Sequence, residues 1–146
     1  EEQSLDPKLV ISKKLDAAKA QRDGALVVED TSLYLEGLNG FPGPLIKWLL
    51  HAVGTQGIYE LTQRIEDRNA TARTVIGYFD GKETYYFEGA IDGHIVAPYG
   101  NDGFGWDTIF QPNGLNETFA EMGDELKPEF SMRTQAFLKL KEHLGQ

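Results

Sequence analysis

The chain has 146 residues, of which 23 are acidic and 14 are basic, giving a formal charge of -9. This acidic balance disfavours non-specific binding to nucleic acid or to membranes. The absence of cysteine excludes disulfides and thiolate chemistry, and the three histidines lack the spacing of a zinc site. With 40% hydrophobic residues, the chain fits a single domain over residues 1–146. No apolar run is long enough to span a bilayer and no signal peptide is present, so we expect a soluble, cytoplasmic protein.

The first predicted element is a helix from about Pro7 to Arg22. Asp6-Pro7 is typical of an N-cap followed by proline in the first turn, and Gly24 is a stop signal. Apolar residues recur between them at helical spacing, namely Val10, Ile11, Leu15 and Ala18. Lys14 lies within this helix, where a solvent-exposed position is the commoner fate of a lysine.

Two adjacent carboxylates, Glu29 and Asp30, follow a short apolar run over residues 25–28 that predicts a buried strand. Because adjacent strand residues point to opposite faces, the two side chains are expected to do different jobs. Acids at the end of a buried strand need a compensating charge, and Mg²⁺ is usually held by one or two carboxylates plus substrate phosphates. The alternative is an acidic turn in which Asp30 caps the next segment. Beyond the pair, Leu33 and Leu35 alternate with polar residues, as in a half-buried strand.

Two helices are predicted after a turn rich in glycine and proline over residues 37–44. The first covers residues 45–50 and ends at Gly54, and the second covers residues 58–65. Trp48, on the first of them, is interpreted as a residue of the core or of an interface.

Two long antiparallel strands are predicted next. Residues 72–79 alternate in side-chain character, Asp80-Gly81 is a hairpin signal, and residues 84–90 return antiparallel. The second strand continues over residues 91–96 through a bend at Asp92-Gly93. Nothing in this region indicates chemistry, and we interpret it as scaffold.

A glycine-rich loop over residues 103–107 contains Phe104, Trp106 and Asp107. Aromatic faces stack on nucleobases for about 1–3 kcal/mol per base, and a carboxylate accepts hydrogen bonds from base or ribose. The alternative is an aromatic cluster that closes the sheet. The glycine motifs of P-loop and dinucleotide-binding proteins are absent.

A last helix is predicted after Lys127-Pro128, with Ser131 near its start. Its apolar side is expected to consist of Phe137, Leu138, Leu140 and Leu144. Lys127, Ser131 and Arg133 bring two cations and a hydroxyl to its N-terminus, where free N–H groups and the helix dipole favour anions. The alternative is ordinary capping by Ser131. Carboxylates for a metal, an aromatic loop for a base and cations for phosphate together make the composition of a nucleotide-hydrolysing pocket.

Four segments of the chain, in order, closely resemble the inosine triphosphate pyrophosphatase family. They are Val28-Glu29-Asp30-Thr31, Gly40-Phe41-Pro42-Gly43-Pro44-Leu45-Ile46-Lys47-Trp48, Gly103-Phe104-Gly105-Trp106-Asp107-Thr108-Ile109-Phe110 and Thr118-Phe119-Ala120-Glu121-Met122. The resemblance implies an α/β fold, with an elongated mixed β-sheet and flanking helices in two lobes. It also implies hydrolysis of ITP, dITP and XTP to the monophosphate and pyrophosphate, with Mg²⁺ as cofactor and a homodimer as the usual assembly.

The resemblance implies roles for individual residues as well. Asp30 resembles the family's essential carboxylate, which helps to bind the metal and to activate the attacking water, and Lys14 resembles a phosphate-contacting lysine. The catalytic residues are then Asp30 and Lys14, and the metal ligands are Glu2 (or Glu1), Glu29 and Asp30. The implied substrate-binding residues are Phe104, Gly105, Trp106, Asp107, Lys127, Ser131 and Arg133, the last of these matching the arginine of the family's Ser-His-Arg signature.

The chain departs from the family pattern in two places. The family opens with a strand and a phosphate-gripping Thr-Gly-Asn-x-x-Lys loop, which would precede Glu1, so we expect an N-terminally shortened domain without that strand. Met132 stands where the family has a histidine that hydrogen-bonds the purine base, and methionine has no such donor. We therefore expect weakened base selectivity. Both departures favour an alternative function, a shortened non-catalytic homologue that serves as a nucleotide-binding or assembly module.

Overall fold

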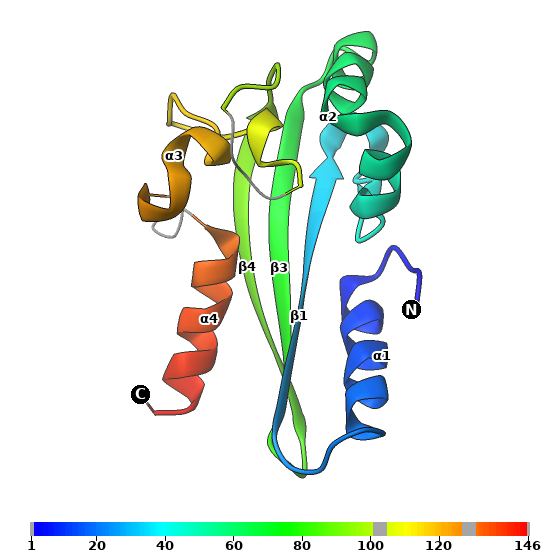
Figure 1. The fold of residues 1–146 in the computed structure, drawn as a ribbon, viewed down its shortest axis with the longest axis vertical. Coiled ribbons are helices and arrows are strands. Elements are labelled where there is room, and N and C mark those ends of the chain that lie inside the picture. Colours follow the sequence, from blue (N-terminus) through cyan, green and yellow to red (C-terminus); the bar gives the residue numbers. More distant parts are fainter. Residues whose placement is uncertain (1, 101–104, 127–130, 146) are drawn as a thin grey trace.

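A computed structural model describes residues 2–100, 105–126 and 131–145 of the chain. A long five-stranded sheet has the strand order β2-β1-β3-β4-β5 and helices beside it (Figure 1). The strands are β1 (Leu26–Leu35), β2 (Pro42–Gly43), β3 (Asn69–Phe79), β4 (Thr84–Ile95) and β5 (Phe110–Pro112). The helices are α1 (Pro7–Lys19), α2 (Ile46–Arg64), α3 (Phe119–Leu126) and α4 (Met132–His143), with 3-10 turns η1 (Glu36–Leu38) and η2 (Asp107–Ile109). The chain is thus the predicted α/β protein. No helix within the described ranges has the length and apolar character needed to cross a membrane.

All strand pairs of the described sheet are antiparallel, so the prediction of a mixed sheet is wrong for this part of the chain. The reason lies in the connections. The hairpin at Asp80-Gly81 makes β3 and β4 antiparallel, as predicted. The excursion through α2 returns to the same end of the sheet, where Leu35 of β1 pairs with Ala70 of β3. A parallel neighbour would need a connection that crosses to the opposite end.

The sequence predicted that the acidic pair Glu29-Asp30 lies at the end of a strand. In the structure the pair lies in the middle of β1. Ladder pairing with β3 runs through both residues, with Glu29 opposite Ile76 and Asp30 opposite Val75. The strand continues to Leu35 because oppositely charged side chains, described below, compensate both carboxylates. The two strands predicted around the pair are therefore one.

Local signals set the helix ends. The Asp6 carboxylate accepts a hydrogen bond from the Lys8 N–H at 3.0 Å and caps α1, which ends at Lys19, a few residues earlier than predicted. The two predicted middle helices are joined in α2, which breaks at Gly54, where φ is 72°. Ser131 caps α4, which was the alternative interpretation of this residue, because its hydroxyl accepts from the Arg133 N–H at 3.1 Å.

The largest apolar core lies at the α2 and α3 end of the sheet and contains Leu33, Ile58 and Phe110. Smaller cores lie under α1 and under α4. The buried residues of α4 are Met132, Ala136 and Leu140. The prediction that Leu138 and Leu144 belong to the apolar side of this helix is wrong, since both are exposed. The buried residues are spaced at i, i+4 and i+8 and lie on a different face of the helix.

Two glycines of β4 allow close packing on the sheet. A Cβ at Gly89 would collide with the Met132 carbonyl oxygen, so glycine lets the start of α4 lie directly on the strand. At Gly93 a Cβ would collide with the Gln111 carbonyl oxygen and with Phe110, which belong to β5. The bend predicted at Asp92-Gly93 is absent, because this glycine admits a neighbouring backbone within a continuous strand.

Candidate active site

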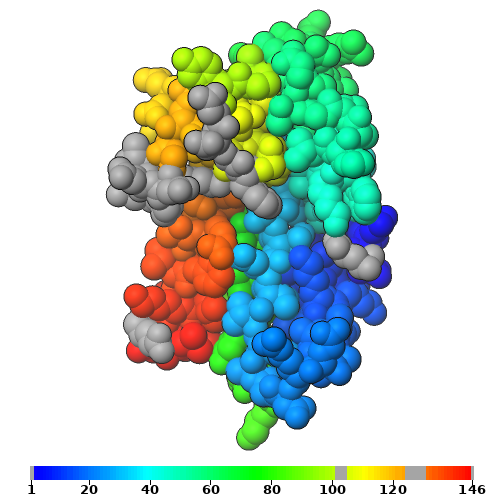
Figure 2. Space-filling model, in the orientation of Figure 1, coloured from blue at the N-terminus to red at the C-terminus, as the bar shows by residue number. Residues whose placement is uncertain are grey.

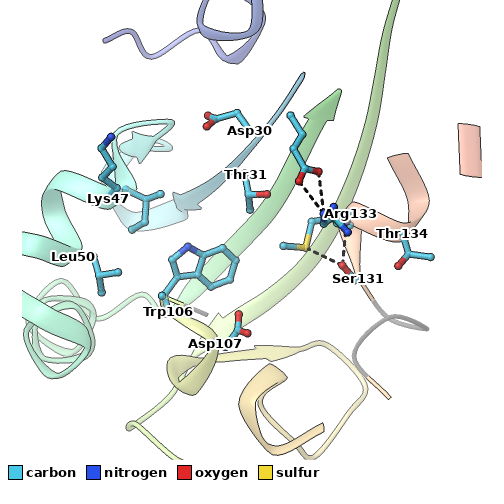
Figure 3. Close-up of a pocket in the computed structure, with 13 residues that line it drawn as sticks. Asp30, Thr31, Lys47, Leu50, Trp106, Asp107, Ser131, Arg133 and Thr134 are labelled. Carbon is cyan, nitrogen blue, oxygen red and sulfur yellow. Dashed lines mark hydrogen bonds and ion pairs between the residues drawn. The ribbon is translucent and has the colours of Figure 1, made fainter. Parts of the chain in front are cut away.

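A pocket of about 640 Å³ lies between β1, the start of α2, the segment around Trp106 and the start of α4 (Figure 3). In the space-filling view, β1 is visible at the surface between α4 and the blue and green helices α1 and α2 (Figure 2). The pocket gathers most of the predicted site residues that the structure describes: Glu29, Asp30, Gly105, Trp106, Asp107, Ser131 and Arg133.

Asp30 is held by Lys14 on the α1 side of the sheet. The Lys14 ammonium donates to Asp30 Oδ1 at 3.0 Å and to the Glu29 carbonyl oxygen at 3.1 Å. The Asp30 side chain is 19% exposed, and its other oxygen, Oδ2, is buried without a hydrogen-bond partner among the described residues. One oxygen is therefore fixed in direction by a cation, while the other is buried and keeps its hydrogen-bonding capacity unused among the described residues. Lys14 itself does not line the pocket and acts on it through Asp30.

Glu29 is held by Arg133 across the sheet. The Arg133 Nε–H lies 3.0 Å from Oε1 and 2.9 Å from Oε2 of Glu29. The guanidinium carbon also lies 4.7 Å from the centre of the Phe137 ring, one turn further along α4. The neighbouring acids of β1 thus form separate ion pairs with two different helices, as expected for side chains on opposite faces of a strand.

Trp106 belongs to the aromatic cluster that was the alternative interpretation, and it also lines the pocket. Its side chain is 5% exposed and packs against Phe110 and Phe119, with ring centres 5.5 and 6.4 Å away, so it belongs to an aromatic cluster at the end of the sheet. Its indole also lines the pocket, where Figure 3 shows it beneath Thr31. The next residue, Asp107, is buried and lines the same wall.

The predicted metal set of Glu2, Glu29 and Asp30 is not assembled. Within the described ranges, no three acidic, histidine or cysteine side chains lie together in a way that could hold a metal ion. Glu29 is paired with Arg133 and points to the other face of β1 from Asp30, and Glu2 is exposed and outside the pocket lining. Asp30 alone of the three has a buried oxygen without a hydrogen-bond partner among the described residues.

Several residues that line the pocket were not predicted as site residues. Two predicted site residues, Phe104 and Lys127, lie outside the described residues. The missed residues that line the pocket are Thr31, Ile46, Lys47, Leu50, Met132 (noted only as a departure) and Thr134. Lys47 lies in the first turn of α2, within one of the segments that carried the family resemblance. Ile46 and Leu50 are four residues apart, a spacing that indicated a helix face without showing what it covers.

Comparisons with known proteins identify the family of this chain. The model of the Ham1 family matches residues 1–143. The inosine triphosphate pyrophosphatase of Schizosaccharomyces pombe is 42% identical over 139 residues, which are 94% of this chain and 74% of that protein. The protein of the same name from Candida albicans is 41% identical over 133 residues, which are 90% of this chain and 66% of that protein.

Two solved structures match closely in fold. One is the Ham1 protein of Staphylococcus aureus, with a TM-score of 0.79 and 29% identity over 99% of this chain and 79% of that chain. The other is a nucleoside-triphosphatase, dITP/XTP pyrophosphatase, from Mycobacterium abscessus, with a TM-score of 0.75 and 29% identity over 96% of this chain and 77% of that chain. The chain therefore belongs to the Ham1 family, and the resemblance to inosine triphosphate pyrophosphatases is confirmed.

Proposed function

We propose that this chain hydrolyses the non-standard purine nucleoside triphosphates ITP, dITP and XTP to the monophosphate and pyrophosphate. The observation that carries the proposal is one pocket whose lining includes Asp30, which is held by Lys14, together with Trp106 and Arg133. The names of the relatives from S. pombe and M. abscessus support the same substrate class.

In the proposed reaction, a water oxygen forms a bond to the α-phosphorus while the bond from that phosphorus to the α–β bridging oxygen breaks. Pyrophosphate is the leaving group, and the proton of the water passes to Asp30 Oδ2. Lys14 supports this role because it holds Oδ1 and so fixes the direction of the carboxylate. A positioned general base contributes about 10²–10⁴-fold to such a step.

The family implies Mg²⁺, and the donor set of the pocket fits it in part. Asp30 would place one negative charge beside phosphate oxygens of the substrate, which is part of the usual Mg²⁺ environment of one or two carboxylates plus phosphates. Because Oδ2 receives the proton of the water, the phosphate oxygens would be the main ligands of the ion. When bound there, the ion would neutralise charge on the triphosphate.

Arg133 and Trp106 support selection of a 6-oxopurine. Arginine donates to the O6 and N7 acceptors of guanine, and hypoxanthine and xanthine carry the same two acceptors. Adenine has an amino donor at position 6, which does not complement a guanidinium. The indole offers an apolar wall for the base. Phe104 and Lys127 remain part of the proposed substrate site through the family resemblance.

Incubation with Mg²⁺ and ITP, XTP, dUTP or ATP tests the proposal. We expect pyrophosphate release from ITP and XTP above that from dUTP and ATP. Folded protein that releases pyrophosphate from none of the four would contradict the proposal. Calorimetric binding of ITP without turnover would then favour the non-catalytic alternative.

We also propose that the chain forms a homodimer, as the family resemblance implies. Three large apolar side chains on or near α2, Phe41, Trp48 and Val53, are 44–48% exposed and offer a surface for a partner copy. Sedimentation velocity should give the mass of two chains at micromolar concentration, and a single-chain mass under those conditions would reject the dimer.

A further inference from the structure

Arg133 lies in the first turn of α4, where a positive charge is disfavoured by the helix dipole. Its side chain is 58% exposed, so burial does not hold it in place. Two contacts do so. The Arg133 Nε–H donates to both oxygens of the Glu29 carboxylate, and the Phe137 ring lies against the guanidinium. A cation at the unfavourable end of a helix, restrained in this way, indicates a role beyond the stability of α4.

We propose that Glu29 is a positioning residue that holds the Arg133 guanidinium at the pocket, and that it is not a magnesium ligand. This inference rests on the proposed function, because the group that Arg133 contacts is the bound nucleotide. A metal ion at Glu29 would have to share the carboxylate oxygens that accept from Arg133 Nε, beside the positive charge of the guanidinium. The one buried acidic oxygen without a hydrogen-bond partner among the described residues belongs instead to Asp30, on the other face of β1.

The ion pair with Glu29 does not use the two terminal nitrogens of the guanidinium. Among the described residues, the hydrogen bonds of the Arg133 side chain come from Nε alone, so the two terminal nitrogens keep their donors for a ligand. Without Glu29, this exposed side chain would sample many rotamers, and the nucleotide would have to order it on binding. By holding Arg133 in place, Glu29 therefore strengthens nucleotide binding, although Glu29 itself does not contact the reacting atoms.

Glu29→Gln tests the proposal, because it removes the charge and keeps the shape. Glu88→Gln is a matched control: Glu88 pairs with Arg73 at 3.6 Å elsewhere on the sheet, and both of these side chains are 36% exposed. In Glu29→Gln we expect KM for ITP to rise about five- to tenfold. The value of kcat and the half-saturating Mg²⁺ concentration should stay at the wild-type level, and Glu88→Gln should match the wild type throughout.

A double-mutant cycle and a direct spectroscopic signal separate this role from a merely structural one. In an Arg133→Gln background, adding Glu29→Gln should produce no further rise in KM, because its effect passes through the missing guanidinium. The ¹H–¹⁵N resonance of the Arg133 Nε–H, assigned by its loss in Arg133→Gln, should shift in Glu29→Gln and remain in place in Glu88→Gln.

An unchanged Nε–H resonance in Glu29→Gln, a tenfold or larger shift in the Mg²⁺ requirement, or a KM effect that persists without Arg133 would overturn the proposal. The resonance is read in the resting protein and does not depend on turnover. If the wild type hydrolyses none of the nucleotides, the proposed function fails while the resonance and the calorimetric affinity for ITP still decide the role of Glu29.

Discussion

Replacement of Asp30 by asparagine is expected to lower kcat for ITP by about 10³-fold, the largest effect of any single substitution that we predict. Asparagine keeps the size of the side chain but removes the basic oxygen that receives the proton of the attacking water. It also removes a negative charge that would stabilise Mg²⁺ bound to the triphosphate. Pyrophosphate release under saturating ITP and Mg²⁺ measures the change.

Asp92→Asn serves as the matched control, because Asp92 is an exposed acid of the same sheet that accepts a hydrogen bond from the Thr71 hydroxyl at 2.8 Å. It should retain wild-type kcat. Loss of the Lys14–Asp30 ion pair should cost no more than about 1 kcal/mol of unfolding free energy, since both partners are partly exposed. Thermal unfolding therefore checks that Asp30→Asn remains folded, and a kcat above a tenth of the wild-type value would reject Asp30 as the general base.

Replacement of Met132 by histidine should raise the preference for ITP over ATP by about 10–100-fold. Met132 is 4% exposed and lines the pocket, and its thioether sulfur lies 4.0 Å from the Ser131 hydroxyl oxygen. Methionine offers no donor to a purine oxygen, whereas an imidazole N–H does. A hydrogen bond that one substrate makes and its competitor cannot make discriminates strongly, because the mismatched group is left unpaired. The ratio of kcat/KM values for ITP and ATP is the measurement.

Met132→Leu is the control for this substitution, because it conserves volume and also lacks a donor. It should leave the ITP to ATP ratio at the wild-type value. If Met132→His stays folded and the ratio does not rise, Met132 does not face the purine base. A wild-type preference for ITP as strong as that of the histidine variant would contradict the account in the same way.

Local chemistry made some parts of the fold predictable. The Asp6 and Ser131 caps, the break at Gly54 and the hairpin at Asp80-Gly81 each depend on the residues of a single turn. The antiparallel pairing of β1 with β3 was not predictable in this way, because it depends on where the chain returns after α2.

The position of the acidic pair shows why local sequence failed at the site. The sequence predicted the end of a strand at Glu29-Asp30 because no basic residue next to them in the chain compensates the charge of the two carboxylates. The compensating charges come from Lys14, on α1, and from Arg133, which is 104 positions away from Glu29 in the chain. The same limit applies to the metal set: three acids of suitable type were present, but strand alternation directs two of them to opposite faces.

The most direct test of the central claim, that this pocket directs water to the α-phosphorus, is hydrolysis of ITP in H₂¹⁸O with Mg²⁺, followed by ³¹P NMR of the products. The account predicts IMP and pyrophosphate in equal amounts, with the ¹⁸O label in the IMP. Release of orthophosphate, or label in the pyrophosphate, would contradict it.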